Sequence, residues 1–308
     1  MKIRNEIFLK SITAVTVILL LFLAAPATLR GEEDFAEWRQ DFITEARQKG
    51  ISDTTLTLLE GVKPDAAIRE RFKKDRQPEF SVDFIQYKNW FVNEKMIQRG
   101  VKKYNTLQDT LTQIENEFEV PAEYLLAIWG LESRFGSHKN THNILDSLVT
   151  LAYSHPRSRS YFRNQLLSYL EMHENEYFPL IDLKGSWAGA MGQPQFMPSS
   201  YLHYAVDFTG SGWADIWNSE VDILASIANY ISQHNWQKNQ GWGRKLAEGE
   251  NLPESKRLVT TGDTNELRFA VTDNFRAIFS YNRSNHYALT ICHLADAIAE
   301  KIKYKKQQ

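Results

Sequence analysis

Apolar residues recur every three to four positions along much of the chain, which is the spacing of amphipathic helices. Phe35, Trp38, Phe42 and Ala46 begin this pattern, and it continues to about Asn116. Further helices are predicted over residues 122–133, 159–173, 220–234 and 284–301. The periodicity therefore predicts a mainly helical fold.

Two short stretches depart from this period. Residues 258–260 and 267–271 are β-like runs on either side of Gly262 and Asp263, which favour a turn. Residues 184–198 are rich in glycine and irregular, and Ser199 or Ser200 is expected to cap the helix that follows. The fold class is thus mainly α with a small β element.

The N-terminus has the pattern of an export signal. Three basic residues precede an apolar run over residues 12–25, which ends in Ala25-Pro26-Ala27. This order is typical of a cleavable secretory signal, and the run is shorter than the roughly 20 residues that span a bilayer. An uncleaved anchor is the alternative, whereas a lipid anchor is excluded because no cysteine follows the run. We expect residues 1–27 to be removed, leaving a periplasmic or secreted protein without a stable membrane anchor.

Composition narrows the function only slightly. The chain has 36 Lys+Arg against 38 Asp+Glu, a net charge of −2, and this balance argues against nucleic-acid binding. A single cysteine, Cys292, can form no internal disulfide. The aromatic content of 12% suits a sugar-binding groove, although large aromatic residues also fill protein cores.

Glu132 occupies an unusual position in its predicted helix. It lies seven residues after Leu125 and four after Ile128, on the same apolar face. A carboxylate on such a face must find partners or lose its charge. Desolvation raises the pKa of a buried carboxyl and makes it a proton donor near neutral pH. The alternative is a structural ion pair with Arg134 or Arg163.

The residues around this glutamate read Ile128-Trp129-Gly130-Leu131-Glu132-Ser133-Arg134-Phe135-Gly136. Other motifs stand in order along the chain at 77–80 (QPEF), 189–192 (GAMG), 195–200 (QFMPSS), 204–208 (YAVDF), 228–230 (ANY), 274–276 (NFR) and 281–284 (YNRS). Together they resemble the lytic murein transglycosylase B family, over nearly all of the chain from about Phe35 to Ile298.

The resemblance implies a lysozyme-like helical catalytic core. Under this interpretation residues 28–120 form an N-terminal helical subdomain and residues 121–240 form the core. Residues 241–308 supply the short β element and a C-terminal helix that complete the groove. The expected partners are peptidoglycan glycan strands, and the protein is expected to be a monomer.

The resemblance also implies a reaction. The family cleaves the β-1,4 bond between N-acetylmuramic acid and N-acetylglucosamine without water, leaving 1,6-anhydromuramoyl ends. By motif position, Glu132 resembles the single catalytic acid and base. Most glycosidases use two carboxylates, whereas here the C6 hydroxyl of the sugar would replace water.

Six further residues match substrate-binding positions of the family. Ser186 would hydrogen-bond the N-acetyl group or orient Glu132, although a serine in a glycine-rich loop is equally a turn residue. Gln195 offers two donors and an acceptor to sugar groups. Asn282 would be a polar partner beside the acid. Tyr230 and Tyr281 would stack on sugar faces, although Tyr281 could equally lie in the core. Tyr87 is the last position, and the segment around it matches the family only loosely.

A loop after residue 206 has the outline of an EF-hand calcium site, with Gly212 at the sixth position. The predicted ligand positions are Asp207, Thr209, Ser211, Trp213 and Asp222. Thr209 and Ser211 stand where Asp or Asn would be expected, so calcium binding would be weak. Asp222 has an alternative role in a capping box that begins at Ser219. We expect no required cofactor and, at most, a structural calcium ion.

Two other functions remain open from the sequence. A hydrolytic muramidase on the same fold would use water in place of the C6 hydroxyl. A non-catalytic peptidoglycan-binding protein would bind glycan without cleaving it, and the apolar setting of Glu132 argues against this.

Overall fold

The computed structural model describes residues 27–74, 82–177, 184–264 and 266–306. Residues 1–26 of the predicted signal and the motif at 77–80 lie outside the described residues. Where the chain is described, no helix combines the length and the apolar character that crossing a bilayer requires. The chain divides into two compact units, residues 1–42 and 43–308. The subdomain borders expected at residues 120 and 240 stay predictions.

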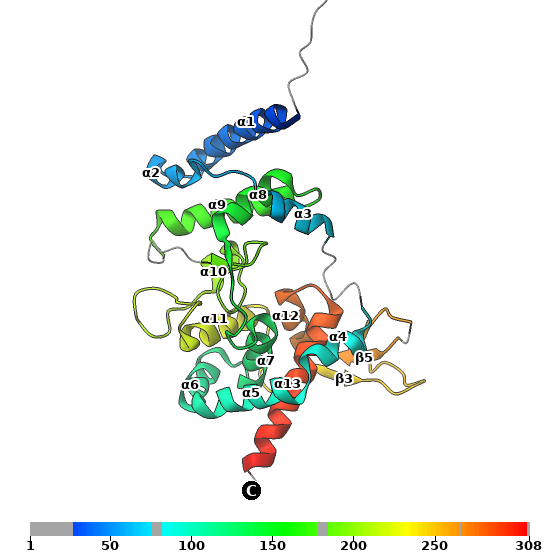
Figure 1. Ribbon diagram of the computed structural model, residues 1–308. Coiled ribbons are helices and arrows are strands. Elements are labelled where there is room, and N and C mark those ends of the chain that lie inside the picture. The colour runs from blue at the N-terminus through cyan, green and yellow to red at the C-terminus, as the bar shows by residue number, and fades with distance from the viewer. Residues whose placement is uncertain (1–26, 75–81, 178–183, 265, 307–308) are drawn as a thin grey trace, which may run out of the picture. The chain divides into compact units, whose positions relative to one another are not determined.

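The fold is mainly helical, as the periodicity predicts (Figure 1). Its helices are α1 (Ala27–Gln48), α2 (Asp53–Leu56), the 3₁₀ helix η1 (Thr57–Leu59), α3 (Ala66–Lys74), α4 (Phe84–Phe91), α5 (Glu94–Thr106), α6 (Gln108–Phe118), α7 (Ala122–Ser133), α8 (Ile144–Ser154), α9 (Arg159–Glu174), α10 (Pro198–Tyr204), α11 (Glu220–Gln233), α12 (Asp273–Tyr281) and α13 (Asn285–Lys306).

The first unit contains most of α1. The rings of Phe35, Trp38 and Phe42 stack one on the next along this helix, with centroids 5.6 Å apart at each step. Residues three and four apart share a helix face, which brings these rings together. The structure confirms the predicted helical period in this region.

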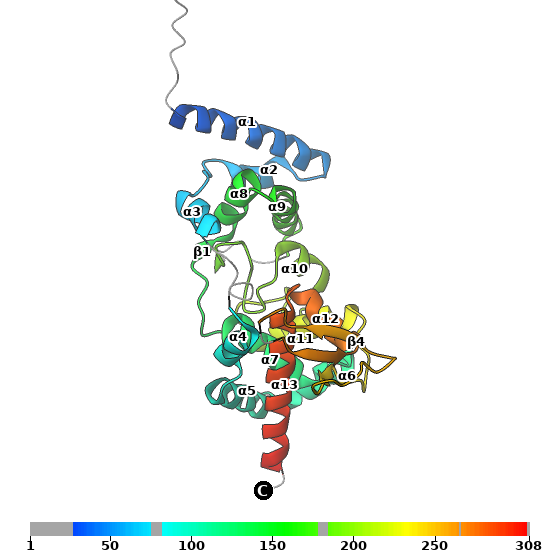
Figure 2. The ribbon, with the colours of Figure 1, turned by 90° about the vertical axis from the view of Figure 1, so that its right-hand side faces the viewer.

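Helix α7 lies at the centre of the second unit. It contacts α5, α6, α11 and α13, and both ribbon views place α13 alongside it (Figures 1 and 2). The five residues from Leu125 to Trp129 are each 0% exposed. A helix that is apolar on all sides is stable only when it is buried, and each large side chain contributes about 1.5–3 kcal/mol through burial. Helix α7 therefore provides a rigid support for the residues at its end.

Helices α8, α9 and α10 form a second group, in which α9 contacts both of the others. The prediction that Ser199 or Ser200 caps α10 is wrong, because α10 begins at Pro198, one or two residues earlier. The Gln165 side chain of α9 takes over part of the capping: its Oε1 accepts from the Ser199 backbone N–H at 3.0 Å. A side chain from a neighbouring helix thus accepts a hydrogen bond from a backbone N–H group at the start of α10, in place of a local capping residue.

Two small antiparallel sheets complete the fold. One has the order β3-β5-β4, formed by β3 (Gly243–Lys245), β4 (Arg257–Thr260) and β5 (Arg268–Val271). The other pairs β1 (His142–Asn143) with β2 (Lys184–Gly185). The two predicted runs match β4 and β5 to within a residue at each end. Strand β3 was not predicted. It begins at Gly243, which has φ +138° and where an added Cβ would lie 2.3 Å from the Ala270 carbonyl oxygen.

Candidate active site

Glu132 lies in the last turn of α7, half-buried, one residue before the helix ends. Three consecutive residues then adopt left-handed conformations, with φ of 51° at Arg134, 54° at Phe135 and 74° at Gly136. The Arg134 N–H still bonds to the Gly130 carbonyl at 2.9 Å. A left-handed residue is a common way to end a helix. This sharp reversal places Glu132 at the exposed end of a buried helix.

The motif around Glu132 has a structural explanation in this reversal. The Phe135 ring folds back on the helix and meets the Trp129 ring edge-on, with centroids 5.4 Å apart. A Cβ added to Gly130 would lie 2.9 Å from the Phe135 Cζ atom, so only glycine fits. The Gly136 N–H donates to the Ser133 hydroxyl at 3.1 Å. The motif residues on either side of Glu132 thus shape the end of its helix.

The Glu132 carboxylate has a partner that the sequence reasoning missed. The Tyr287 hydroxyl, from the first turn of α13, donates to Glu132 Oε1 at 2.6 Å, and Tyr287 is only 1% exposed. Burial first, and the Glu132 charge next, raise the pKa of Tyr287 well above its usual value. Tyr287 therefore remains a neutral phenol that can donate to Glu132 at every physiological pH.

Neither of the two arginines considered as ion-pair partners of Glu132 pairs with it. Arg163 pairs with the Glu45 carboxylate, and within the described part of the chain Arg134 forms no ion pair with Glu132. The neutral Tyr287 hydroxyl donates a hydrogen bond to one carboxylate oxygen of Glu132. It orients the carboxyl group without adding a positive charge beside it.

An aromatic cluster lies next to this pair. The Tyr281 ring is nearly parallel to that of Tyr287, with centroids 6.4 Å apart, and it lies 4.7 Å from the Tyr230 ring. Tyr230 is 9% exposed and donates to the Ser280 carbonyl at 2.7 Å, while Tyr281 donates to the Pro194 carbonyl at 2.8 Å. Both hydroxyls are therefore used within the protein, and the predicted stacking of the two rings on sugars stays a prediction.

The glycine-rich segment after β2 carries two predicted polar residues. Ser186 Oγ accepts from the N–H groups of Ala188 at 3.3 Å and Ala190 at 3.0 Å, which are the contacts of a turn residue. Gln195 has φ 55°, and its Nε2 donates to the Gly192 carbonyl at 2.6 Å. These bonds hold the segment in shape, while the ligand contacts predicted for the two residues stay predictions.

Asn282 and Tyr87 flank the cluster on other elements. Asn282 is half-buried at the end of α12, and its carbonyl accepts from the Ser284 N–H at 2.7 Å. Tyr87 of α4 is 4% exposed, with its ring centroid 6.2 Å from that of His286. Tyr87 also contributes to the raised pKa of Tyr287, after burial and Glu132. Residues far apart in sequence thus converge near the Glu132–Tyr287 pair.

Gln193 is a second residue that the sequence reasoning missed. Its Oε1 accepts from the Trp129 indole N–H at 2.7 Å, and its Nε2 donates to the Trp217 carbonyl at 2.7 Å. A Cβ added to Gly136 would lie 2.4 Å from Gln193 Oε1. The side chain connects α7 to the glycine-rich segment. Gln193 lies between the motifs at 189–192 and 195–200, so no sequence signal singled it out, and its partners depend on the tertiary fold.

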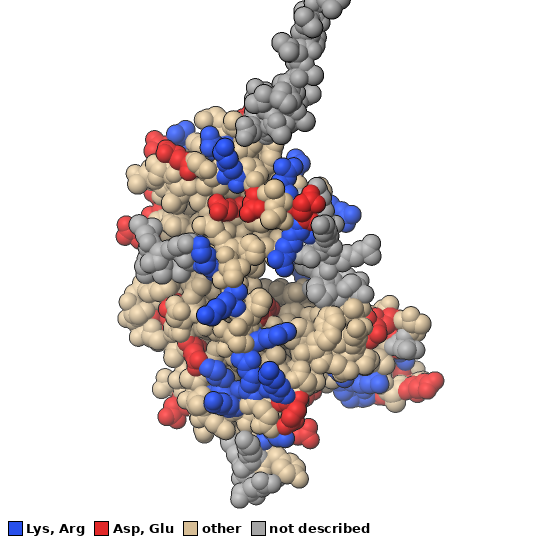
Figure 3. Space-filling model, in the orientation of Figure 1, with Lys and Arg blue, Asp and Glu red and all other residues tan. Residues whose placement is uncertain are grey.

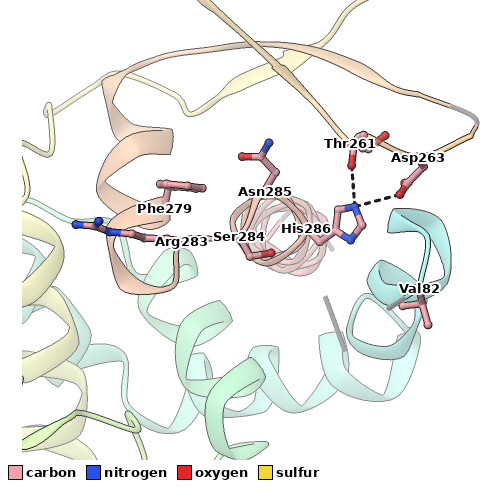
Figure 4. A pocket seen from close by; sticks show the side chains of 9 residues that line it. Val82, Thr261, Asp263, Phe279, Arg283, Ser284, Asn285 and His286 are labelled. Atoms are coloured by element: carbon pink, nitrogen blue, oxygen red, sulfur yellow. Dashed lines mark hydrogen bonds and ion pairs between the residues drawn. The ribbon is translucent and has the colours of Figure 1, made fainter. Parts of the chain in front are cut away.

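A cavity of about 370 Å³ lies at the N-terminus of α13, which Figure 4 shows nearly end-on. Here His286 Nε2 faces two acceptors, the Thr261 carbonyl at 3.0 Å and Asp263 Oδ1 at 3.4 Å. Because both neighbours are acceptors, Nε2 carries the proton. Asp263 Oδ2 also accepts from the Phe84 N–H at 2.7 Å. This cluster fastens α4 and the β4–β5 connection to the helix that carries Tyr287.

The predicted calcium loop is held together by its own hydrogen bonds. Asp207 accepts from the Gly212 N–H at 2.7 Å, the Ser211 N–H at 2.9 Å and the Thr209 hydroxyl at 3.1 Å. Burial would raise the pKa of Asp207, but the hydrogen bonds from Gly212 and Ser211 outweigh it and lower the pKa. The Trp213 carbonyl accepts from the Ser211 hydroxyl at 3.0 Å.

Asp222 completes this loop from the first turn of α11. It is 0% exposed, and it accepts from the N–H groups of Phe208 at 3.0 Å, Thr209 at 3.1 Å and Asp215 at 3.1 Å. Its own N–H bonds to the Ser219 hydroxyl, which confirms Ser219 as the cap. The Ser219 N–H bonds to the Asp215 carbonyl, so the Asp222 carboxylate does not complete the expected capping box. Among the described residues no group of three or more His, Cys, Asp or Glu side chains is arranged to hold a metal ion. The loop therefore keeps its shape through protein contacts.

Comparison with known proteins gives consistent results. The family model described as "Transglycosylase SLT domain" matches residues 34–258 and 245–296. Membrane-bound lytic murein transglycosylase B of Escherichia coli K12 is 32% identical over 288 residues, covering 84% of this chain and 77% of the relative.

Solved structures agree in fold. SltB3 from Pseudomonas aeruginosa, in complex with NAG-NAM-pentapeptide, superposes with a TM-score of 0.77 at 33% identity, covering 86% of this chain and 79% of the other. Escherichia coli Slt35 in complex with calcium gives a TM-score of 0.74 at 30% identity, covering 86% and 93%. The expected mainly α, lysozyme-like fold is confirmed.

Proposed function

Because the chain belongs to the transglycosylase SLT domain family, we propose that it cleaves the β-1,4 bond between N-acetylmuramic acid and N-acetylglucosamine in peptidoglycan without water. The products carry 1,6-anhydromuramoyl ends. The observation that carries this proposal is Glu132, at the end of a buried helix, with one carboxylate oxygen bonded to the buried Tyr287 hydroxyl.

In this mechanism Glu132 acts twice. It first donates its proton to the glycosidic oxygen as the bond from that oxygen to C1 of the muramyl sugar breaks. The C6 hydroxyl of the same sugar then attacks C1 and returns a proton to Glu132, so the carboxyl group is regenerated. An intramolecular hydroxyl needs no second carboxylate to activate water, in contrast to most glycosidases. Tyr287 would hold the carboxyl in one orientation through both steps.

The aromatic cluster and the polar residues around Glu132 are proposed to bind the sugars. The rings of Tyr230 and Tyr281 have their hydroxyls bonded internally, which suits stacking better than hydrogen bonding. Ser186, Gln195 and Asn282 would provide polar contacts, and Tyr87 would contribute from α4. The solved complex of SltB3 with NAG-NAM-pentapeptide supports a ligand that combines glycan and peptide.

Calcium is proposed to be dispensable for catalysis. The Slt35 structure was solved with calcium, and Asp207, Asp222 and the Trp213 carbonyl offer oxygen ligands of the type that calcium prefers. A bound ion would supply only structural reinforcement, because the loop is already held by hydrogen bonds to both carboxylates. The Thr209 and Ser211 hydroxyls would make the site weak.

The protein is proposed to act as an exported monomer on the cell wall, either in the periplasm or after secretion. The support is the export pattern of residues 1–27 and the wall polymer that the named relatives cleave. The Escherichia coli relative is named as membrane-bound, so fractionation of cells that produce this chain would test its own location.

A digest of purified sacculi, followed by mass analysis of the released fragments, tests the reaction. We expect muropeptides whose muramyl ends are lighter by one water than hydrolysed ends. Reducing ends alone would identify a hydrolytic muramidase instead. Binding without any release of fragments would identify a non-catalytic peptidoglycan-binding protein.

A further inference from the structure

Helix α5 carries a row of positive charges on the side opposite its buried face. Lys95, Arg99 and Lys102 are spaced four and three residues apart, so they share one face of the helix. The buried residues Met96, Gly100 and Val101 lie on the other side. We call this row, together with Arg134, the α5 basic face. In Figure 3, Lys and Arg side chains gather over the region where Figure 1 places α5.

The α5 basic face is joined directly to the end of the catalytic helix. The Arg99 guanidinium donates to the Arg134 carbonyl oxygen, and its Cζ lies 5.5 Å from the centre of the Phe135 ring. Arg134 follows Glu132 by two residues. The row of charge therefore begins beside the candidate active site and extends along α5.

Some exposed cations elsewhere in the described chain are paired with carboxylates. Arg47, Lys238 and Arg244 each pair with a carboxylate. In the same part of α5, Glu94 is paired with Lys301 and Lys103 with Glu220, so both of these carboxylates are already neutralised. Within the described residues, the cations of the α5 basic face form no ion pair.

Unpaired like charges in one helical row repel one another by about 0.2–0.5 kcal/mol per neighbouring pair. The chain as a whole has a net charge of −2, so the row is a local concentration and not the result of a basic composition. An extended anionic ligand would turn this repulsion into attraction.

We propose that the α5 basic face binds the carboxylates of peptidoglycan stem peptides, attaching the enzyme to the polymer beside the bond that it cleaves. A stem peptide ends in at least one free carboxylate, and many stems lie along one glycan strand. This inference rests on the proposed function, because it assumes a peptidoglycan substrate. It assigns the stem peptides to α5 and Arg134, whereas the sugars lie against the aromatic cluster.

The test uses Lys95→Gln/Lys102→Gln, which removes two exposed cations without changing a buried residue. The matched control is Lys49→Gln/Lys245→Gln, which removes the same charge from exposed positions elsewhere. All proteins carry Glu132→Gln so that the polymer stays intact. Binding is measured by co-sedimentation with intact sacculi and with sacculi whose carboxylates are amidated.

Exposed ion pairs contribute about a two- to fivefold factor each. We therefore expect the α5 variant to bind intact sacculi about 4- to 25-fold more weakly at low salt, while the control binds as the parent does. The difference should shrink as salt approaches 0.5 M, because exposed charges are then screened. It should vanish on amidated sacculi.

Two outcomes would overturn the proposal. Equal binding of the α5 variant and the control to intact sacculi would show that the row is only a solvated face. An equal loss on amidated sacculi would show contact with sugars or damage to the fold, and thermal unfolding separates those two causes. Failure of the proposed reaction is seen separately, as the absence of anhydro ends after digestion by the unmodified enzyme.

Discussion

Two regions of the molecule are built around buried or half-buried carboxylates, and they use them in opposite ways. Asp222 is fully buried and accepts three backbone N–H groups, so its charge is satisfied by the loop that it holds. Glu132 is half-buried at the end of a helix, and its carboxylate accepts a hydrogen bond from the neutral hydroxyl of Tyr287. Three backbone N–H donors fix a carboxylate in a structural role. A carboxyl group at the end of a helix, oriented by a neutral hydroxyl, is suited to exchange a proton with a ligand.

The largest expected effect comes from Glu132→Gln. The amide can still accept the Tyr287 hydrogen bond, so the fold should be retained, but it cannot donate and then recover a proton. Loss of a general acid costs about 10²–10⁴-fold in rate. Release of anhydro-ended fragments should fall by at least this factor, with an unchanged thermal midpoint. Retained turnover would place the acid elsewhere.

Asp222→Asn should have the reverse signature. One acceptor oxygen is replaced by an NH₂ group that faces backbone N–H donors, so we expect a loss of about 3 kcal/mol of unfolding free energy. Urea denaturation measures this, and the rate per folded molecule should change little. Asp109→Asn, at an exposed position in α6, is the control and should stay within about 0.5 kcal/mol of the parent. A stable but inactive Asp222→Asn protein would contradict the comparison.

Tyr287→Phe tests how far Glu132 depends on its neutral partner. Removing the hydroxyl eliminates the 2.6 Å bond while keeping the ring that packs beside Tyr281. We expect turnover to fall about tenfold, equivalent to about 1.4 kcal/mol.

The pH profile distinguishes positioning from packing in this variant. The hydroxyl stabilises the ionised carboxylate, so without it the activity profile should move toward higher pH. Tyr201→Phe removes a different buried hydroxyl bond, to the Ala214 carbonyl, and should leave the profile in place. An equal shift in both variants would show a general loss of packing.

The sequence predicted Glu132 because a carboxylate interrupted an apolar helical face, which is a local pattern. It could not predict Tyr287, which lies 155 residues away and meets Glu132 only when α13 packs on α7. Gln193 was missed for the same reason, since its partners Trp129 and Trp217 come from separate segments. Motifs locate residues that act, whereas the contacts that orient them depend on the fold.

The errors in secondary structure have separate causes. Helix α8 was not predicted, although its apolar residues at 144, 145, 148, 149 and 152 follow the helical spacing. The cap of α10 was misassigned because Gln165 of α9 supplies a bond that a local serine was expected to make. At α10 tertiary packing thus replaces the local signal on which a sequence-based prediction depends.

The smallest expected effect concerns acid stability of the Asp207 loop. Although burial opposes it, hydrogen bonds from Gly212 and Ser211 lower the pKa of Asp207 below its ordinary value of 3.8. The folded chain therefore favours the ionised form, and this contributes stability above about pH 4 that is lost as the pH falls through the lower folded value. Asp207→Asn removes the contribution, so thermal midpoints of the variant and the parent should differ at pH 6 and converge toward pH 2. If the thermal midpoints of the variant and the parent differed by the same amount from pH 6 to pH 2, the charge of the Asp207 carboxylate would not be what stabilises the loop.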